Sequence, residues 1–169
     1  HRDNIMTLVT PTPTAIDIFP DSIQSALREI ERAMNMNVMV RMRDKDSSNM
    51  GVMMHLFSNR FQAFGFTNRA NGAYRVAFIH GTEPWVIKMA RRHIPSDTGY
   101  TDNLREAFVY ANIEPEHRVY LPETFLWKDA VLVQRKYPPD ANRHSLRFKD
   151  IEKVAGVIGV GDLHNGNIG

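Results

Sequence analysis

The chain has 169 residues, of which 43% are hydrophobic and 24% charged, enough for one domain with a substantial hydrophobic core. It contains no Cys and no H-x-x-x-H spacing, so disulfides and Cys-based metal sites are excluded and a zinc site is not expected. No run approaches the roughly 20 apolar residues of a membrane span, and the net charge is only +2, which argues against binding to nucleic acid. The absence of Cys fits a cytoplasmic protein, which we expect.

The first segment predicts an extended arm followed by a helix. Two prolines within residues 10–14 indicate the arm. Pro20-Asp21 begins the helix, and Gln24 stands three residues after Asp21, as in a capping box. The apolar residues that follow have helical spacing: Ile23, Ala26, Leu27, Ile30 and Met34.

Strands are predicted next. In residues 38–43, Val38, Val40 and Met42 share one face of a strand while Arg41 and Arg43 lie on the other. The polar residues 44–49 indicate a turn. Residues 51–57 and 60–66 are interpreted as two further strands. The methionines of this region are interpreted as core residues: Met50, Met53 and Met54.

The second half begins with a predicted hairpin, in which residues 73–79 and 85–90 flank a turn at 80–84. Thr101-Asp102 then caps a second helix. Residues 119–121 and 130–133 are the next predicted strands, residues 137–139 break the chain, and a third helix starts at Ser145. Strands grouped before helices favour an α+β architecture.

Two charged residues are candidates for phosphate chemistry. Lys88 lies between apolar residues of a predicted strand, where its ammonium group would neutralise phosphate oxygens. Glu106 lies on the following helix, where its carboxylate would pair with Lys88 and fix its position. The alternative is that Lys88 only packs its stem on the sheet and that Glu106 is a solvated helix residue.

The segment from Gly65 to Gly72 is a candidate for a loop that covers phosphates, because backbone N–H groups in such a turn bind anions. It does not match the G-x-G-x-x-G pattern. A plain hairpin with Asn71-Gly72 as its turn is an equally good interpretation.

The final residues carry the most informative pattern. Asp162 is followed five residues later by Asn167 on a Gly-broken loop after a predicted helix, which is how kinase-like phosphotransferases build a catalytic loop. Asp162 would orient the attacking hydroxyl and accept its proton, Asn167 would hold Mg²⁺, and His164 would support the loop. The structural alternative is a turn at the end of a helix, stopped by Gly161 and Gly166.

Together these pieces resemble the protein-kinase-like superfamily. Residues 161–168 look like the G-D-L-H-x-G-N-I loop of aminoglycoside phosphotransferases and related bacterial and phage kinases. Val86-Ile87-Lys88 looks like the V-A-I-K strand of protein kinases, and Glu106 follows Lys88 by eighteen residues, close to the usual separation in the family. Residues 71–76 resemble the end of the glycine-rich loop, and residues 130–137 would be the fifth strand and the hinge that meets the adenine.

The resemblance implies a kinase-like N-lobe at residues 60–137, with an antiparallel sheet and an αC-type helix. Residues 138–169 would begin a helical C-lobe, and residues 1–59 would be an N-terminal extension. The implied reaction is transfer of the γ-phosphoryl of ATP, with Mg²⁺, to a hydroxyl of a protein Ser or Thr. We expect the chain to be a fragment of such a kinase that ends before the D-F-G segment. The implied site residues are catalytic Asp162, Lys88 and Glu106, cofactor-binding Gly72, Lys88, Gln134 and Lys136, and metal-binding Asn167.

Three alternatives remain. The acceptor would be a small molecule if the aminoglycoside-type loop sets the function. A pseudokinase or partner-binding module would account for the shortened C-lobe, the Gly-poor loop and the unassigned N-terminal extension. Val160 also departs from the family, which has His or Tyr at this position. A nucleic-acid-binding domain would use scattered arginines that form no dense patch: Arg41, Arg43, Arg91 and Arg92.

Overall fold

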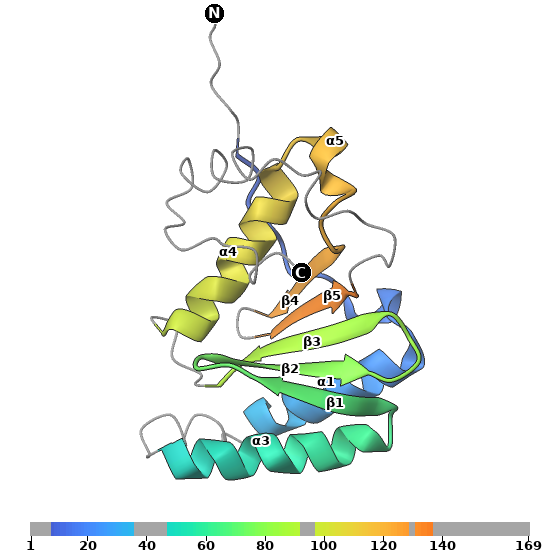
Figure 1. The fold of residues 1–169 in the computed structure, drawn as a ribbon, viewed down its shortest axis with the longest axis vertical. Helices are drawn as coiled ribbons and strands as arrows, with labels where there is room; N and C mark the ends of the chain where they lie inside the picture. Colours follow the sequence, from blue (N-terminus) through green and yellow to red (C-terminus); the bar gives the residue numbers. More distant parts are fainter. Residues whose placement is uncertain (1–7, 36–46, 92–96, 129–130, 137–169) are drawn as a thin grey trace, which may run out of the picture.

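The computed structural model describes residues 8–35, 47–91, 97–128 and 131–136. An antiparallel sheet of five strands lies at its centre, in the order β1-β2-β3-β5-β4. The strands are β1 (Phe66–Asn71), β2 (Arg75–His80), β3 (Trp85–Ala90), β4 (Thr124–Lys128) and β5 (Val131–Arg135). The helices are η1 (Ile16–Ile18), α1 (Asp21–Asn35), α3 (Ser47–Gln62), α4 (Thr98–Asn112) and α5 (Pro115–Arg118) (Figure 1). The predicted α+β class is confirmed.

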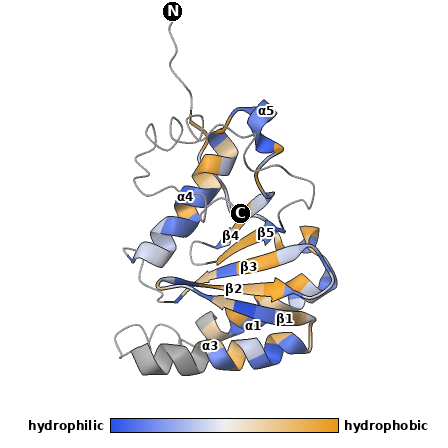
Figure 2. Cartoon of the chain, viewed as in Figure 1, coloured by the Kyte–Doolittle hydropathy of each residue, from blue (hydrophilic) through white to orange (hydrophobic). Residues whose placement is uncertain are grey.

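Helices cover the two faces of the sheet (Figure 1). α1 and α3 pack on one face, where the main core includes Leu27, Phe61, Phe78, Ile87 and Val133. α4 packs on the other face against β3, β4 and β5, with a smaller cluster of Ala107, Leu126 and Leu132. Figure 2 shows apolar residues along β2 and β3, and a largely hydrophilic α5. Among the described residues, no helix combines the length and apolarity needed to cross a bilayer.

The strand register decides which side chains face α4. Because side chains alternate along a strand, the burial of Ile87 and Met89 in the main core turns Lys88 toward α4. Cross-strand pairing aligns one row of residues on this face, Ala77, Lys88 and Leu132. A second row lies beside it, formed by Ile79, Val86 and Gln134.

Several predicted elements are confirmed. α1 begins at Asp21, and its apolar stripe is buried at Ile23, Ala26, Leu27 and Ile30. β3 has the predicted bounds, while β2 and β5 are each displaced by one or two residues. α4 begins at Thr98 rather than at Thr101-Asp102, with Asp97 as its N-cap residue. At α1, the Gln24 side chain donates to the Phe19 carbonyl oxygen at 2.7 Å.

The strands predicted at 51–57 and 60–66 are wrong, because most of that stretch belongs to helix α3. Met54, Phe57 and Phe61 are spaced three and four residues apart and are all buried. That spacing places them on one helical face toward the sheet, and this packing outweighs the local strand signal. The turn predicted at 44–49 also gives way to α3 from Ser47 onward.

Two shorter predictions also need correction. Residues 119–121 form no strand and lie in the turn after α5, and the edge strand is β4 instead. The stretch after Gly65 is not a loop but strand β1, so the hairpin turn is confined to Gly72, Ala73 and Tyr74. This favours the plain-hairpin interpretation of its shape, while leaving Gly72 at the tip.

Other predictions lie outside the described residues. These are the strand at 38–43, the break at 137–139, the helix from Ser145 and the terminal loop with Asp162, His164 and Asn167. The expected boundary at residue 59 falls inside α3. α1 and α3 share the main core with the sheet, so the described part of residues 1–59 packs with the strands.

Candidate functional site

The sequence singled out Lys88 and Glu106, and the structure brings them together. Lys88 lies on the third strand, and its Nζ donates to Glu106 Oε1 on α4 at 3.0 Å. The Glu106 side chain is 9% exposed and that of Lys88 18% exposed, so solvent screens this pair less than a surface salt bridge. The surface-charge alternative for these two residues therefore does not describe their environment.

Glu106 also holds two residues that sequence reasoning did not connect with it. Its Oε2 pairs with the guanidinium of Arg75 from β2, and its Oε1 accepts from Gln134 Nε2 of β5 at 3.1 Å. Gln134 Nε2 in addition donates to Thr124 Oγ1 of β4 at 3.0 Å. One carboxylate thus ties α4 to three neighbouring strands, and it balances two cations.

A pocket of about 380 Å³ lies beside this cluster. Residues of the β1–β2 hairpin from Ala70 to Ala77 form most of its wall, and Lys88 and Asp102 complete it. Asp102 lies near Arg105 of the same helix, at 3.8 Å. The pocket is therefore lined by a hairpin tip and by a lysine, two features that suit an anion.

The tip of that hairpin is fixed by close contacts. The Gly72 amide donates to the Arg75 carbonyl at 2.8 Å, which closes the turn. Arg91 spans the tip, since its backbone amide donates to the Tyr74 carbonyl at 2.9 Å and its guanidinium to the Gly72 carbonyl at 3.1 Å. A Cβ on Gly99 would lie 2.4 Å from the Tyr74 carbonyl oxygen, so the first turn of α4 packs directly against the tip.

The same face of the sheet carries an apolar strip. Ala77, Ile79 and Val86 are only partly buried, whereas their neighbours on the opposite face are fully buried. The strip lies in the same two rows as Lys88 and Gln134. The strip is an apolar surface in the rows next to the charged pocket, and it includes Ala77 of the pocket wall.

The other predicted site residues lie in different surroundings. Gln134 is buried, and its side-chain amide is engaged by Glu106 and Thr124, so its place is within the cluster. Lys136 follows β5, and its backbone amide donates to the Pro84 carbonyl at 2.8 Å. Their cofactor-binding roles stay predictions. Asp162 and Asn167 lie outside the described residues.

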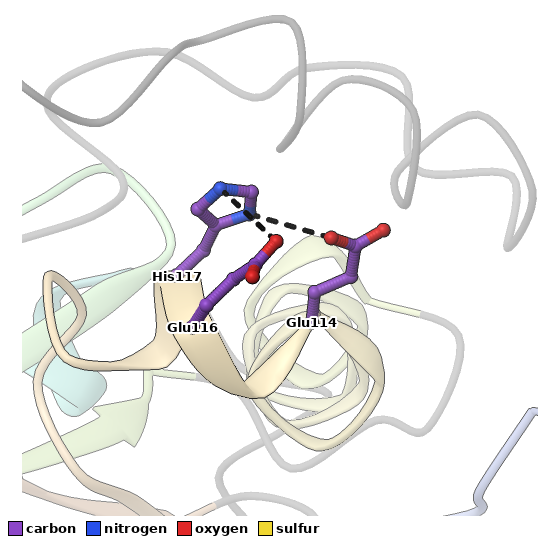
Figure 3. A group of neighbouring side chains, drawn as sticks. All are labelled: Glu114, Glu116 and His117. Carbon is purple, nitrogen blue, oxygen red and sulfur yellow. Dashed lines mark ion pairs between the residues drawn. The ribbon is translucent and has the colours of Figure 1, made fainter.

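A second group of titratable residues lies on and beside α5 (Figure 3). One ligand atom from each of Glu114, Glu116 and His117 falls within 4.8 Å of the others, and His117 lies 4.0 Å from both carboxylates. Both glutamates are exposed, and exposed acidic groups commonly lie together without a metal ion. The cluster is therefore interpreted as a surface charge group, and it belongs to a different element from the pocket.

Comparisons of the chain with protein-family models, with curated proteins and with solved structures found no match. The kinase-like resemblance of the sequence therefore stays a prediction. The contacts of the Lys88–Glu106 cluster and the pocket beside it are the features of the described residues that bear on function.

Proposed function

We propose that this chain is part of an ATP-dependent phosphotransferase of the protein-kinase-like class. The observation that carries the proposal is the ion pair between Lys88 on the third strand and Glu106 on the next helix. In protein kinases a Lys of the third strand and a Glu of the following helix form such a pair, which positions the Lys against the nucleotide phosphates. The antiparallel sheet and the hairpin over the pocket agree with this proposal.

The roles of the described residues follow from their contacts. Lys88 neutralises phosphate oxygens of the nucleotide, and Glu106 holds the Lys88 ammonium group at the pocket. Backbone amides near Gly72 cover the phosphates, and the apolar strip of Ala77, Ile79 and Val86 receives the base. Binding in this position orients the γ-phosphoryl group for transfer.

The remaining roles come from the resemblance of the terminal loop. Asp162 accepts the proton of the attacking hydroxyl, which belongs to a protein Ser or Thr, and Asn167 holds Mg²⁺. When bound, Mg²⁺ neutralises charge on the phosphates. A reaction that consumes ATP suits the cytoplasm, which we propose as its location. A small-molecule hydroxyl is the alternative acceptor.

Nucleotide binding tests the proposal. Thermal unfolding of the whole chain with MgATP is compared for the wild type, Lys88→Met and Lys128→Met. MgATP at about 100 times its Kd would stabilise the wild type by about 2.7 kcal/mol, or roughly 5–10 °C. Lys88→Met should lose most of that shift, whereas Glu106 keeps Arg75 as a counter-ion and the fold survives. Lys128 is an exposed lysine of β4 paired with Glu31, so its replacement should leave the shift intact.

Two results would overturn parts of the proposal. If millimolar MgATP does not raise the Tm of the wild-type chain, the chain has no nucleotide site, and the proposed phosphotransferase function is wrong. A shift that Lys88→Met retains would mean that nucleotide binds elsewhere. A partner-binding module without catalysis predicts the first of these results.

A further inference from the structure

We propose that Arg75 is a second phosphate-binding residue of the pocket and that it selects ligands with a polyphosphate chain. This inference rests on the proposed function and adds a residue that the sequence analysis did not single out. Arg75 lines the pocket together with Lys88, from the adjacent strand β2. Its side chain is 17% exposed, close to the 18% of Lys88.

The charges around the pocket carry the argument. Glu106 is the shared counter-ion of Arg75 and Lys88, so one carboxylate serves two cations. The described acid of the pocket wall is Asp102, which lies near Arg105. The charged side chains that line the pocket are therefore Arg75, Lys88 and Asp102, two cations and one carboxylate, and a lining with this sign of charge favours an anionic ligand.

The geometry of Arg75 suits this role. Its contacts with Asn103 Oδ1, at 3.1 Å, and with Glu106 both run through Nη1. A guanidinium has five N–H donors in a planar fork, so these contacts use only one of its nitrogens. The fork matches a phosphate with two parallel hydrogen bonds, which an ammonium group cannot provide. Arg75 and Lys88 would then contact different phosphates of one chain.

The experiment measures the affinity of the whole chain for ATP, AMP and inorganic tripolyphosphate by calorimetry. Arg75→Met should weaken ATP and tripolyphosphate binding by about 10- to 100-fold, the size of a lost charged hydrogen bond, and AMP binding by less than about threefold. Arg75→Lys should recover only part of the loss, because it restores charge without the fork. Arg135→Met is the matched control, since Arg135 pairs with Glu123 on the surface and stacks over Trp85 of the opposite face.

The outcomes separate this inference from the proposed function. An equal loss for ATP, AMP and tripolyphosphate would make Arg75 a positioning residue of Glu106 and overturn the inference, as would no loss at all. If the wild type binds tripolyphosphate but neither ATP nor AMP, the proposed nucleotide site is wrong. The phosphate-binding role of Arg75 would still be supported if Arg75→Met abolished tripolyphosphate binding. A wild type that binds none of the three ligands would overturn both. Circular dichroism identifies any variant that fails to fold. If Arg75→Met is unfolded, the affinities of Arg75→Lys for the three ligands are compared with those of the wild type instead.

Discussion

The replacement Glu106→Gln tests whether this carboxylate organises the α4 face of the sheet. Glu106 is 9% exposed and holds Lys88, Arg75 and Gln134. The glutamine amide has the same shape but no charge, and it presents a nitrogen donor to groups that are themselves donors. Breaking a buried ion pair costs about 3–5 kcal/mol. We expect about 3 kcal/mol here, because Lys88 and Arg75 keep 18% and 17% exposure.

That loss corresponds to a fall in Tm of roughly 6–12 °C for a chain of this size. Denaturant unfolding followed by circular dichroism measures the free energy directly. Glu123→Gln is the matched control, because the Glu123–Arg135 pair is nearly half exposed on both sides and should contribute less than about 1 kcal/mol. Equal small losses for both variants would refute the reasoning, since they would make Glu106 an ordinary surface carboxylate.

A double-mutant cycle separates the charge effect from packing. Arg75→Met should cost less in the Glu106→Gln background than in the wild type, because the variant already lacks the counter-ion of Arg75. A coupling energy of about 1–2 kcal/mol is expected for residues in direct contact. Strictly additive losses would mean that the two side chains do not interact.

Three further predictions concern the surroundings of the site. Gly99→Ala should destabilise by about 1–3 kcal/mol in thermal unfolding, because its Cβ would lie 2.4 Å from the Tyr74 carbonyl; a stabilised variant, as helix propensity alone implies, would contradict this packing. His80→Ala should lower the free energy of unfolding in denaturant by about 3 kcal/mol, because the buried ring bonds the Phe64 carbonyl and the Thr82 and Glu83 amides. A loss under about 1 kcal/mol would mean that these hydrogen bonds contribute little to stability. Asn112→Ala should speed amide exchange at Val9, whose backbone amide and carbonyl both bond the Asn112 side chain; unchanged exchange would show that the arm is held elsewhere.

Local patterns were sufficient where the sequence and the packing agree. α1 has a helix start at Pro20-Asp21 and a single apolar stripe, so its place in the core follows from spacing alone. β3 is bounded by a turn and rich in β-branched and aromatic residues, and its bounds were predicted correctly. Lys88 within it is the one polar interruption on its strand, which made it visible as a candidate.

Other features depend on contacts between distant parts of the chain. Residues 51–57 fit a strand nearly as well as a helix, and the choice is decided by Met54, Phe57 and Phe61 packing against the sheet. The same holds for the site. Arg75 and Gln134 reach Glu106 only because β2, β3 and β5 pair in this register, and α4 lies across them. No local pattern near Arg75 indicates its partner, whereas Lys88 interrupts an apolar strand and Glu106 lies on the predicted helix that follows.

The polar cluster is more informative than either of its charged residues alone, because an apolar contact could pack α4 on the sheet equally well. The same face is closed next to it by Ala107, Leu126 and Leu132, an ordinary apolar contact between α4 and the sheet. Proteins in which apolar residues replace a buried ion pair are often as stable as the original or more stable. The presence of such a pair is therefore weak evidence that it stabilises the fold. A chain that places Glu106 between two cations, next to a pocket that both cations line, therefore bears a cost that ligand binding would offset. These charges support the proposal of an anionic ligand in that pocket.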